Sequence, residues 1–540
     1  MENRVLASTW AYHDGTKHLF QSIRAGAGGG LDWSNQPRPY KIYSTVDPIP
    51  LPKDPPLPEL PAVEAIAAGG REPAGRRVPD LNTLAGILFL SAGITKRLTF
   101  PRGSMDFRAA ACTGALYHIE LYLACGDLPD LEAGVYHFGV HDFALRRLRA
   151  GDYRGVLVRA SGGEPAVAAA PVIIVCATTF WRNAWKYRAR AYRHAFWDSG
   201  TILANLLAAA AGYDVPARIV CGFFDAEVNR LLDLDVEREV ALALVPLGRD
   251  KATPSGPSGP SGLTVDPLGF PTIPLSKESV DYPQIRAMHA ASSLRSEDDV
   301  RAWRAESGAA SPGANTAFHA ADVRASSRAL VALQPLEHPD LPTDSIARVI
   351  VRRGSSRRFA RESIRFAQLS TILDRATRGI PADFFEPSGE RVEPTGAILN
   401  TLYLIVHAVE GLAPGAYVFD RYARALELLK EGNFRREAGY LGLEQNLPAD
   451  ASVNVYVLAH LPPILERFGN RGYRVAQLDA AITGGKLYLA AYTLRLGATG
   501  LTFYDDDVTA FFSPHAAGKS VMFLTALGRL LKRTPRIPVD

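Results

Sequence analysis

The chain has 540 residues, too many for one hydrophobic core, so we expect two or more domains. A hydrophobic content of 47%, a charged content of 21% and a net charge of +4 indicate a globular protein without a basic face for nucleic acid. The four cysteines have no metal-binding spacing, and no apolar run reaches the roughly 18–20 residues that span a bilayer. Because the N-terminus lacks a signal-peptide core, we expect a cytoplasmic protein.

Residues 1–79 show little regular pattern, and seven prolines lie between residues 48 and 61. Proline ends helices and is excluded from central strands, so we expect an extended arm that wraps a domain surface. A disordered leader is the alternative.

A first domain is expected at 80–250. Its predicted elements are, in order, a helix over 81–94, strands at 119–123, 134–138 and 171–177, a helix through 202–207, a short helix over 225–232 and a strand over 239–245. This order mixes helices and strands without strict alternation, which predicts an α+β fold.

Residues 251–340 are expected to be a linker and connector. The proline, serine and glycine run at 254–262 cannot bury enough apolar surface to fold, and one helix is predicted near 296–305.

A second domain is expected at 341–540, and it repeats the first. Segments 120–123, 134–138 and 190–198 have counterparts 281 residues later, and 224–228 has one 280 residues later. A duplication of this size predicts a pseudo-symmetric pair of domains that imitates a twofold dimer within one chain.

The repeat fails at one informative place. The recurring residues of 190–198 indicate a scaffold common to both halves, whereas Lys186 and Tyr187 are replaced by Arg467 and Phe468 at the same offset. A lysine beside a tyrosine at an apolar site can act as a base, because burial lowers the lysine pKa and a nearby ammonium lowers the tyrosine pKa. The alternative is a snorkelling lysine beside a core tyrosine.

The run 352–359 holds four arginines and two serines just before a predicted helix. Arg353, Ser355 and Arg357 suit a phosphate, because a guanidinium offers a bidentate fork and a hydroxyl adds a short neutral donor. The alternative is a solvated basic loop.

Two loops of small residues are candidate contacts for a flat ligand, because glycine lets backbone N–H groups approach it closely. The candidate residues are Cys112, Thr113, Gly114, Gly497, Thr499, Gly500 and Leu501. Ordinary tight turns and a helix C-cap are the alternatives. Cys112 has no histidine at catalytic spacing, so we do not expect a nucleophilic thiolate.

Taken together, these motifs resemble the flavin-dependent nitroreductase superfamily, and more closely its SagB/ThcOx branch, the azoline-oxidising dehydrogenases of peptide natural-product pathways. The resemblance covers most of 80–250 and 340–540 and part of the N-terminal arm. It implies two three-layer α/β/α domains that form a pseudo-dimer in one chain, with FMN at the domain interface. Whether the chain is a monomer or a homodimer stays open.

The resemblance also assigns roles to the motifs. The Arg-x-Ser-x-Arg motif at 353–357 would contact the FMN phosphate, ribityl chain and ring edge. The loop 111–114 would pack on the flavin from the other domain, and the segment 497–501 would run beside flavin N5. Lys186 and Tyr187 match the branch's Lys-Tyr pair, proposed to take the proton while the hydride goes to FMN.

The two halves depart from the family pattern in complementary ways. The first half has no Arg-x-Ser-x-Arg motif before its first helix, and the second half has Arg467 and Phe468 instead of the Lys-Tyr pair. Our hypothesis is one flavin site per chain, gripped by the second half and completed by Lys186, Tyr187 and the small-residue loop. The loop 111–114 also departs from the family's Pro-Ser-Gly-Gly-like sequence.

The implied function is that of an FMN-dependent oxidoreductase, and its sharpest form is the oxidation of azolines to azoles within a peptide. The expected partners are a peptide or small-molecule substrate and biosynthetic partner enzymes, with no metal, nucleic acid or membrane. Two alternatives remain open, a general NAD(P)H-dependent nitro or quinone reductase and a non-catalytic flavin-binding scaffold.

Overall fold

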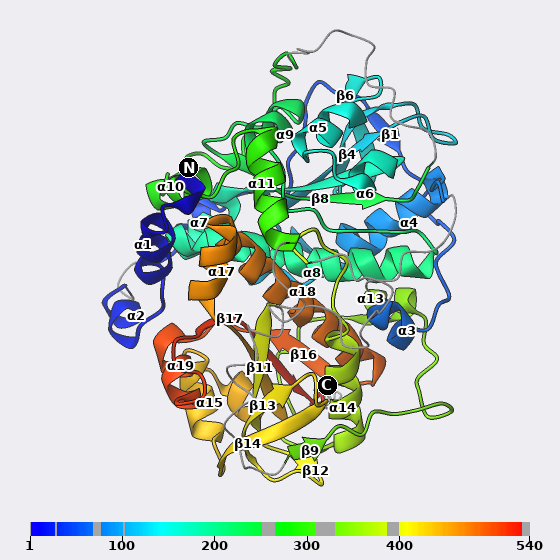
Figure 1. Cartoon of the computed structure of the whole chain (residues 1–540). Helices are drawn as coiled ribbons and strands as arrows, with labels where there is room; N and C mark the ends of the chain where they lie inside the picture. Colours follow the sequence, from blue (N-terminus) through cyan, green and yellow to red (C-terminus); the bar gives the residue numbers. More distant parts are fainter. Residues whose placement is uncertain are drawn as a thin grey trace.

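The structure is a computed structural model (Figure 1). It describes residues 2–26, 30–68, 77–100, 103–250, 265–308, 330–385 and 399–531. The predicted spacer at 254–262 lies outside these residues. No helix that the structure describes is long and apolar enough to cross a membrane.

The first half is built on a six-stranded sheet in which all neighbouring strands are antiparallel. In spatial order its strands are β1 (Pro48–Pro50), β6 (Ala144–Ala150), β5 (Gly134–Gly139), β4 (Ile119–Cys125), β7 (Val172–Thr179) and β8 (Glu239–Leu247). Every residue of β7 is buried because helices cover both faces of the sheet.

The second half contains a seven-stranded antiparallel sheet with the same central order. Its strands are β16 (Gly497–Gly500), β17 (Ser520–Gly528), β15 (Val453–Ala459), β11 (Asn400–Val406), β13 (Gly415–Asp420), β14 (Ala425–Glu431) and β9 (Leu330–Ala332). The matching strand order confirms the predicted duplication of an α+β fold.

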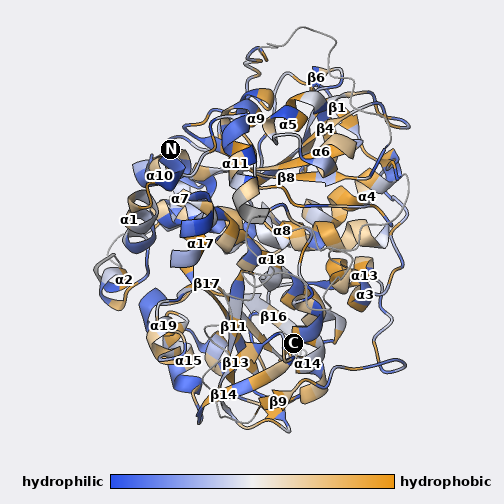
Figure 2. Ribbon diagram, in the orientation of Figure 1, coloured by the Kyte–Doolittle hydropathy of each residue, from blue (hydrophilic) through white to orange (hydrophobic). Residues whose placement is uncertain are grey.

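Side chains alternate between two hydrophobic clusters along the central strands. Ile174 of β7 points to the helices between the two sheets, whereas Ile173 packs with α5 (Arg154–Ala160) and α9 (Asp225–Leu231) on the outer face. This alternation is the two-residue period of a strand that is buried on both sides. In Figure 2, hydrophobic colour accordingly gathers on β8 and on the neighbouring helix α4 (Leu81–Ala92).

Two long helices, α8 (Ala191–Gly212) and α18 (Arg471–Thr493), lie between the sheets and join the halves (Figure 1). All 23 residues of α18 are buried. The helices approach so closely that a Cβ added to Gly200 would lie 2.4 Å from the Cβ of Ala481. Glycine is therefore required at this crossing.

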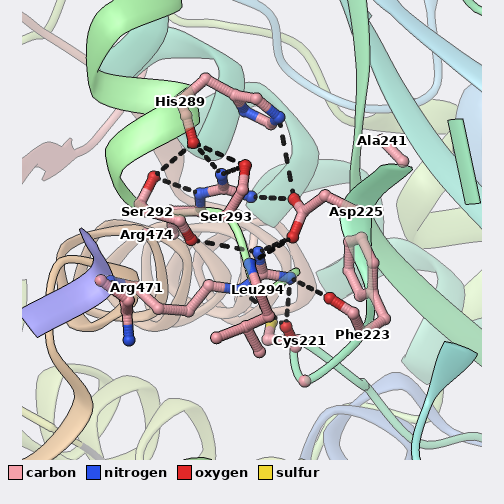
Figure 3. A network of polar contacts seen from close by, with 12 residues as sticks. Cys221, Phe223, Asp225, Ala241, His289, Ser292, Ser293, Leu294, Arg471 and Arg474 are labelled. Carbon is pink, nitrogen blue, oxygen red and sulfur yellow. Dashed lines mark hydrogen bonds and ion pairs between the residues drawn. The ribbon is translucent and has the colours of Figure 1, made fainter. Parts of the chain in front are cut away.

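A buried carboxylate ties each half to the long helix of the other. Asp225 accepts hydrogen bonds from Arg471 Nη1 at 2.5 Å and Arg474 Nη1 at 2.8 Å (Figure 3). We call these three residues the Asp225 clamp. Burial offsets much of the Coulomb gain of such a group, but removing the carboxylate would strand two buried cations.

The Asp505 clamp is its counterpart across the pseudo-twofold axis. Asp505 accepts from Arg190 Nη1 at 2.9 Å and from Arg193 Nη1 at 2.7 Å. Burial would raise the pKa of Asp505, but Arg190 and Arg193 outweigh this effect and lower it to about 2.

The N-terminal arm is also present twice. Arg193 donates to Thr16 Oγ1 at 3.0 Å just after α1 (Ala7–Gly15), and Arg474 donates to Ser292 Oγ at 2.8 Å just after α10 (Pro283–Ala291). The range 251–340, expected to be a connector, therefore contains a folded second copy of the arm.

The range 1–79, expected to be extended, includes short helices.

The remaining elements of the described residues are η1 (Glu2–Arg4), α2 (Phe20–Gly26), η2 (Trp33–Asn35), α3 (Ala62–Ala67), β2 (Ile94–Phe100), β3 (Gly103–Arg108), η3 (Thr113–Ala115), α6 (Pro165–Ala169), α7 (Phe180–Tyr187), η4 (Arg188–Arg190), α11 (Glu297–Gly308), α13 (Ile346–Arg352), β10 (Ile364–Arg365), α14 (Phe366–Ala376), β12 (Val409–Glu410), α15 (Arg435–Leu441), α16 (Asn446–Asp450), α17 (Leu461–Phe468) and α19 (Asp505–Phe512). Helix α11 matches the helix predicted near 296–305.

We predict that Asp225→Asn lowers the free energy of unfolding by about 3–5 kcal/mol, because two buried guanidiniums lose their only carboxylate in the clamp. Urea titration followed by circular dichroism measures this loss. The matched control is Asp298→Asn, since Asp298 pairs with Arg301 on the surface and is 91% exposed. Equal effects of the two substitutions would contradict the role of the clamp.

A second prediction concerns pH. The folded-state pKa of Asp505, about 2, lies below its unfolded value of about 3.9, so its stabilising effect is present above pH 4 and is lost as the pH falls toward 2. The wild-type chain should lose about 2 kcal/mol through this group between these pH values, and Asp505→Asn should lack that component. Urea titrations at several pH values in this range give the dependence of the free energy of unfolding on pH for both proteins. An identical dependence in wild type and variant would refute the prediction.

Candidate functional site

The Arg-x-Ser-x-Arg motif of the second half meets the small-residue loop of the first. Arg353 Nε donates to the carbonyl of Ala109 at 2.9 Å, and its Nη2 donates to the carbonyl of Arg108 at 3.0 Å. Helix α13 presents the arginine at its end, after Ser345 caps the first turn by accepting from Arg348 N. One side chain thus joins the two halves at the predicted site.

Strand β16 holds the motif from the other side. Ser356 N donates to the carbonyl of Ala498 at 2.9 Å. A Cβ added to Gly497 would lie 2.4 Å from Ser356 Oγ, so this close contact requires glycine. Thr499 and Gly500 pair with β17, and Leu501 N donates to Leu524 O at 3.1 Å.

Tyr488 of α18 lies between these two segments. Its hydroxyl accepts a hydrogen bond from Gly500 N and lies 3.4 Å from Ser355 Oγ. Its ring centroid is 5.9 Å from the guanidinium carbon of Arg353. Tyr488 was not predicted from the sequence, because an aromatic residue inside an apolar helix has no neighbouring motif that distinguishes a site residue from a core residue.

Asp198 of α8 anchors the small-residue loop. Its Oδ1 accepts from Thr113 N at 2.9 Å and from Thr113 Oγ1 at 2.8 Å, and its Oδ2 lies 3.0 Å from Cys112 Sγ and 2.9 Å from His118 Nε2. Burial, followed by the charge of Asp198, raises the pKa of Cys112 far above its usual value. Cys112 is therefore a thiol that positions the loop, as its lack of a nearby catalytic histidine in sequence led us to expect.

Gly114 brings Tyr187 to the loop. Its φ of +67° favours glycine, and an added Cβ would lie 2.9 Å from the hydroxyl of Tyr187. The ring of Tyr187 also makes an edge contact with His194, with centroids 4.6 Å apart. Helix α7 ends at Tyr187, so the helix terminus sets the position of this phenol against the loop.

The electrostatics at Tyr187 correct one expectation. Burial raises the pKa of Tyr187, as do Asp198 and Cys112, while Arg357 of the second half lowers it by a smaller amount. The expected lowering by the neighbouring ammonium is therefore wrong, and Tyr187 is a neutral phenol at neutral pH. Lys186 is exposed rather than at an apolar site, with Nζ 5.3 Å from the Tyr187 ring centroid.

The donor set fits FMN. Burial lowers the pKa of Arg353, and its near neighbours are phenols and carbonyls. Among the described residues, neither Arg353 nor Arg357 has an ion pair with a carboxylate, and buried Ser356 Oγ has no hydrogen-bond partner. A partly buried guanidinium without a counter-ion, such as that of Arg353, favours an anionic ligand such as a phosphate.

The backbone nearby leaves room for a flat group. A Cβ added to Gly354 would have its nearest neighbour at 3.6 Å, and one added to Gly500 at 3.4 Å, both ordinary contact distances. The described residues contain no group of three or more side chains that could hold a metal ion.

At the position related to this site by the internal repeat, the equivalent aspartate has different hydrogen-bond partners. Asp479 corresponds to Asp198 and accepts from Leu399 N at 2.9 Å and Asn400 Nδ2 at 2.6 Å. Burial raises the pKa of Asp479 to about 6. The similar Thr395-Gly396-Ala397 loop lies outside the described residues.

In the described part of the run 76–79, the arginine is not available as a phosphate grip. Arg77 donates to Asp214 at 2.8 Å. The charge of Arg77 is therefore already paired on the surface, whereas Arg353 is partly buried and has no carboxylate partner among the described residues.

Comparison with known proteins gives two kinds of match. The model of the nitroreductase family matches residues 140–249 and 350–528, more than half of the chain. A protein of Methanocaldococcus jannaschii, MJ1384, named a nitroreductase, is 27% identical over 169 residues, which are 31% of this chain and 80% of that protein. The microcin B17-processing protein McbC of Escherichia coli is 27% identical over 180 residues, which are 32% of this chain and 65% of McbC.

A solved structure from Anabaena variabilis, also named a nitroreductase, shares the whole architecture. It has 25% sequence identity and a TM-score of 0.72, and the match covers 97% of this chain and 99% of that one. The tandem arrangement of the two halves is therefore also found in another chain of similar length.

We predict that Gly114→Ala destabilises the protein by about 1–2 kcal/mol through its positive φ, with a further loss from the displaced Tyr187 hydroxyl. Thermal and urea unfolding measure the effect. Gly15→Ala serves as control, because an added Cβ there meets nothing within 4 Å. A Gly114 variant as stable as the control would refute the predicted contact.

Proposed function

Because the chain belongs to the nitroreductase family, we propose that it is an FMN-dependent oxidoreductase of the SagB/ThcOx type, with a composite site formed by both halves. The observation that carries the proposal is Arg353, which is partly buried among carbonyls and phenols and has no carboxylate partner among the described residues. An unpaired guanidinium in this position favours an anion, and the phosphate of FMN would supply one.

The residues present divide the work of holding the cofactor. Arg353, Ser355 and Arg357 would hold its phosphate, ribityl chain and ring edge, and the loop anchored by Asp198 would pack against its ring. Backbone of 497–501 would line the ring as well. Once bound, the flavin supplies the exchange of a hydride with the substrate.

The protein handles the accompanying proton. Tyr187 stays protonated, so it donates a hydrogen bond to the substrate and does not act as a base. Lys186 is the proposed proton acceptor, because its exposed amine lies 5.3 Å from the ring of Tyr187, beside the small-residue loop.

The proposed substrate is a peptide with thiazoline or oxazoline rings, which loses two hydrogens per ring, with dioxygen reoxidising the flavin. Similarity to McbC, a microcin B17-processing protein, supports a peptide substrate and biosynthetic partner enzymes. A general NAD(P)H-dependent nitro or quinone reductase is the second candidate, supported by the relative MJ1384.

The Lys186→Ala variant separates these candidates. We expect it to keep FMN but to lose azoline oxidation by roughly 10²-fold or more, because general base catalysis is typically of this size. Mass spectrometry of a thiazoline peptide follows the loss of two hydrogens, and flavin absorbance follows cofactor content. Arg353→Ala should instead lose FMN, since it removes the phosphate contact.

The chain offers a matched control in Arg467→Ala, at the position equivalent to Lys186 in the other half. We expect that variant to keep its activity. Nearly unchanged turnover of nitro compounds or quinones by Lys186→Ala would favour the general reductase. FMN that neither a peptide nor NADH reduces would favour a non-catalytic scaffold, and failure to reconstitute with FMN would end the proposal.

A further inference from the structure

The internal repeat creates a second position that is equivalent to the candidate site. There the segment 217–224 of the first half takes the place of 497–504, because Phe224 and Tyr504 each begin an equivalent helix. Ala217 pairs with Leu247 just as Gly497 pairs with Gly528. The backbone that would line a second flavin is therefore present in the same register.

A segment of the second half, which follows α14 as strand β2 follows α4 in the first half, occupies the free edge of that backbone. Ile219 N donates to Pro381 O at 2.8 Å, and Asp383 N donates to Ile219 O at 3.0 Å. Ile219 and Ala382 thus pair as a parallel bridge. We call residues 380–385, which follow α14, the plug.

Asp383 of the plug also accepts hydrogen bonds from the backbone of the segment 217–224. Its two carboxylate oxygens accept from Cys221 N and Gly222 N, each at 2.8 Å. By sequence position these two N–H groups correspond to that of Leu501, which donates to Leu524 O at the candidate site, and to that of Thr502. Because Asp383 is buried and its carboxylate is already bonded, a ligand at the second position would have to displace a charged group from its partners.

An aromatic cover closes the same position. Trp303 of α11 is 2% exposed, and its Nε1 donates to Phe468 O at 3.1 Å. Its ring lies 5.5 Å from that of Phe468, which stands where the first half has Tyr187. A Cβ added to Gly222 would lie 2.9 Å from the Trp303 ring, so no gap separates the cover from the backbone.

The first copy of the arm has no tryptophan at the corresponding place in its sequence. α11 follows α10 as α2 follows α1, and the run 26–30, which begins at the last residue of α2, contains only glycine and one alanine.

We propose that the plug and Trp303 have converted the second position into a structural joint, so that the chain binds one FMN, at the site of Arg353. The stoichiometry rests on the proposed function, whereas the structural role of the plug does not. The Asp225 clamp supports the joint, because Arg471 also donates to Cys221 O at 2.9 Å (Figure 3).

Cofactor stoichiometry is the first test. Purified protein is saturated with FMN and desalted, and the flavin released by denaturation is compared with protein determined by amino-acid analysis. We expect a ratio close to one, and a ratio near two would overturn the inference. A chain that binds no flavin would contradict the proposed function, and the stability test below would then decide on the plug.

Stability of flavin-free protein is the second test. Asp383→Ala should lower the melting temperature by several degrees, because two buried N–H groups lose their acceptor. Asp383→Asn, which keeps one acceptor oxygen, should have a smaller effect and serves if the alanine variant does not fold. Each of these variants, if it folds, should keep the ratio of flavin to protein of the wild type. An unchanged melting temperature would overturn the role of the plug.

Discussion

Two buried carboxylates hold this molecule together. Asp225 and Asp505 each receive two arginines from the start of the long helix of the other half or the residue just before it, so neither clamp can form within one half. A paired buried charge gives little net stability, but an unpaired one is costly. The clamps therefore fix how the halves are placed relative to each other more than they add to the stability of the protein. A site shared between the halves depends on that placement.

The candidate site shows how this placement is used. Arg353 reaches from the second half to carbonyls of the first, while Tyr187 of the first half lies against Gly114 and near Arg357 of the second. The contacts of Arg353 and the effect of Arg357 on Tyr187 require both halves. A rigid interface between α8 and α18, where glycine meets alanine, is thus a condition for cofactor binding as well as for folding.

The sequence predicted the fold where chemically distinctive residues recur at a fixed offset, and it pointed to the candidate site where the repeat fails. The motif 353–357 and the Lys186–Tyr187 pair do not recur in the other half, and the structure places the motif and Tyr187 against the segment 108–114. Properties created by packing were not predictable. The raised pKa of Tyr187 depends on burial and on Asp198, and the hydrogen bonds of Asp383 join segments that lie far apart in the sequence.

The fusion of two copies into one chain has an evolutionary consequence. In a homodimer, one codon specifies both copies of every side chain, so a substitution that improves one interface position alters its twin as well. Here Lys186 and Arg467, or Trp303 and the glycine run at 26–30, are encoded separately. Each position can therefore accumulate changes suited to one task, and selection for catalysis at one end no longer constrains selection for rigidity at the other.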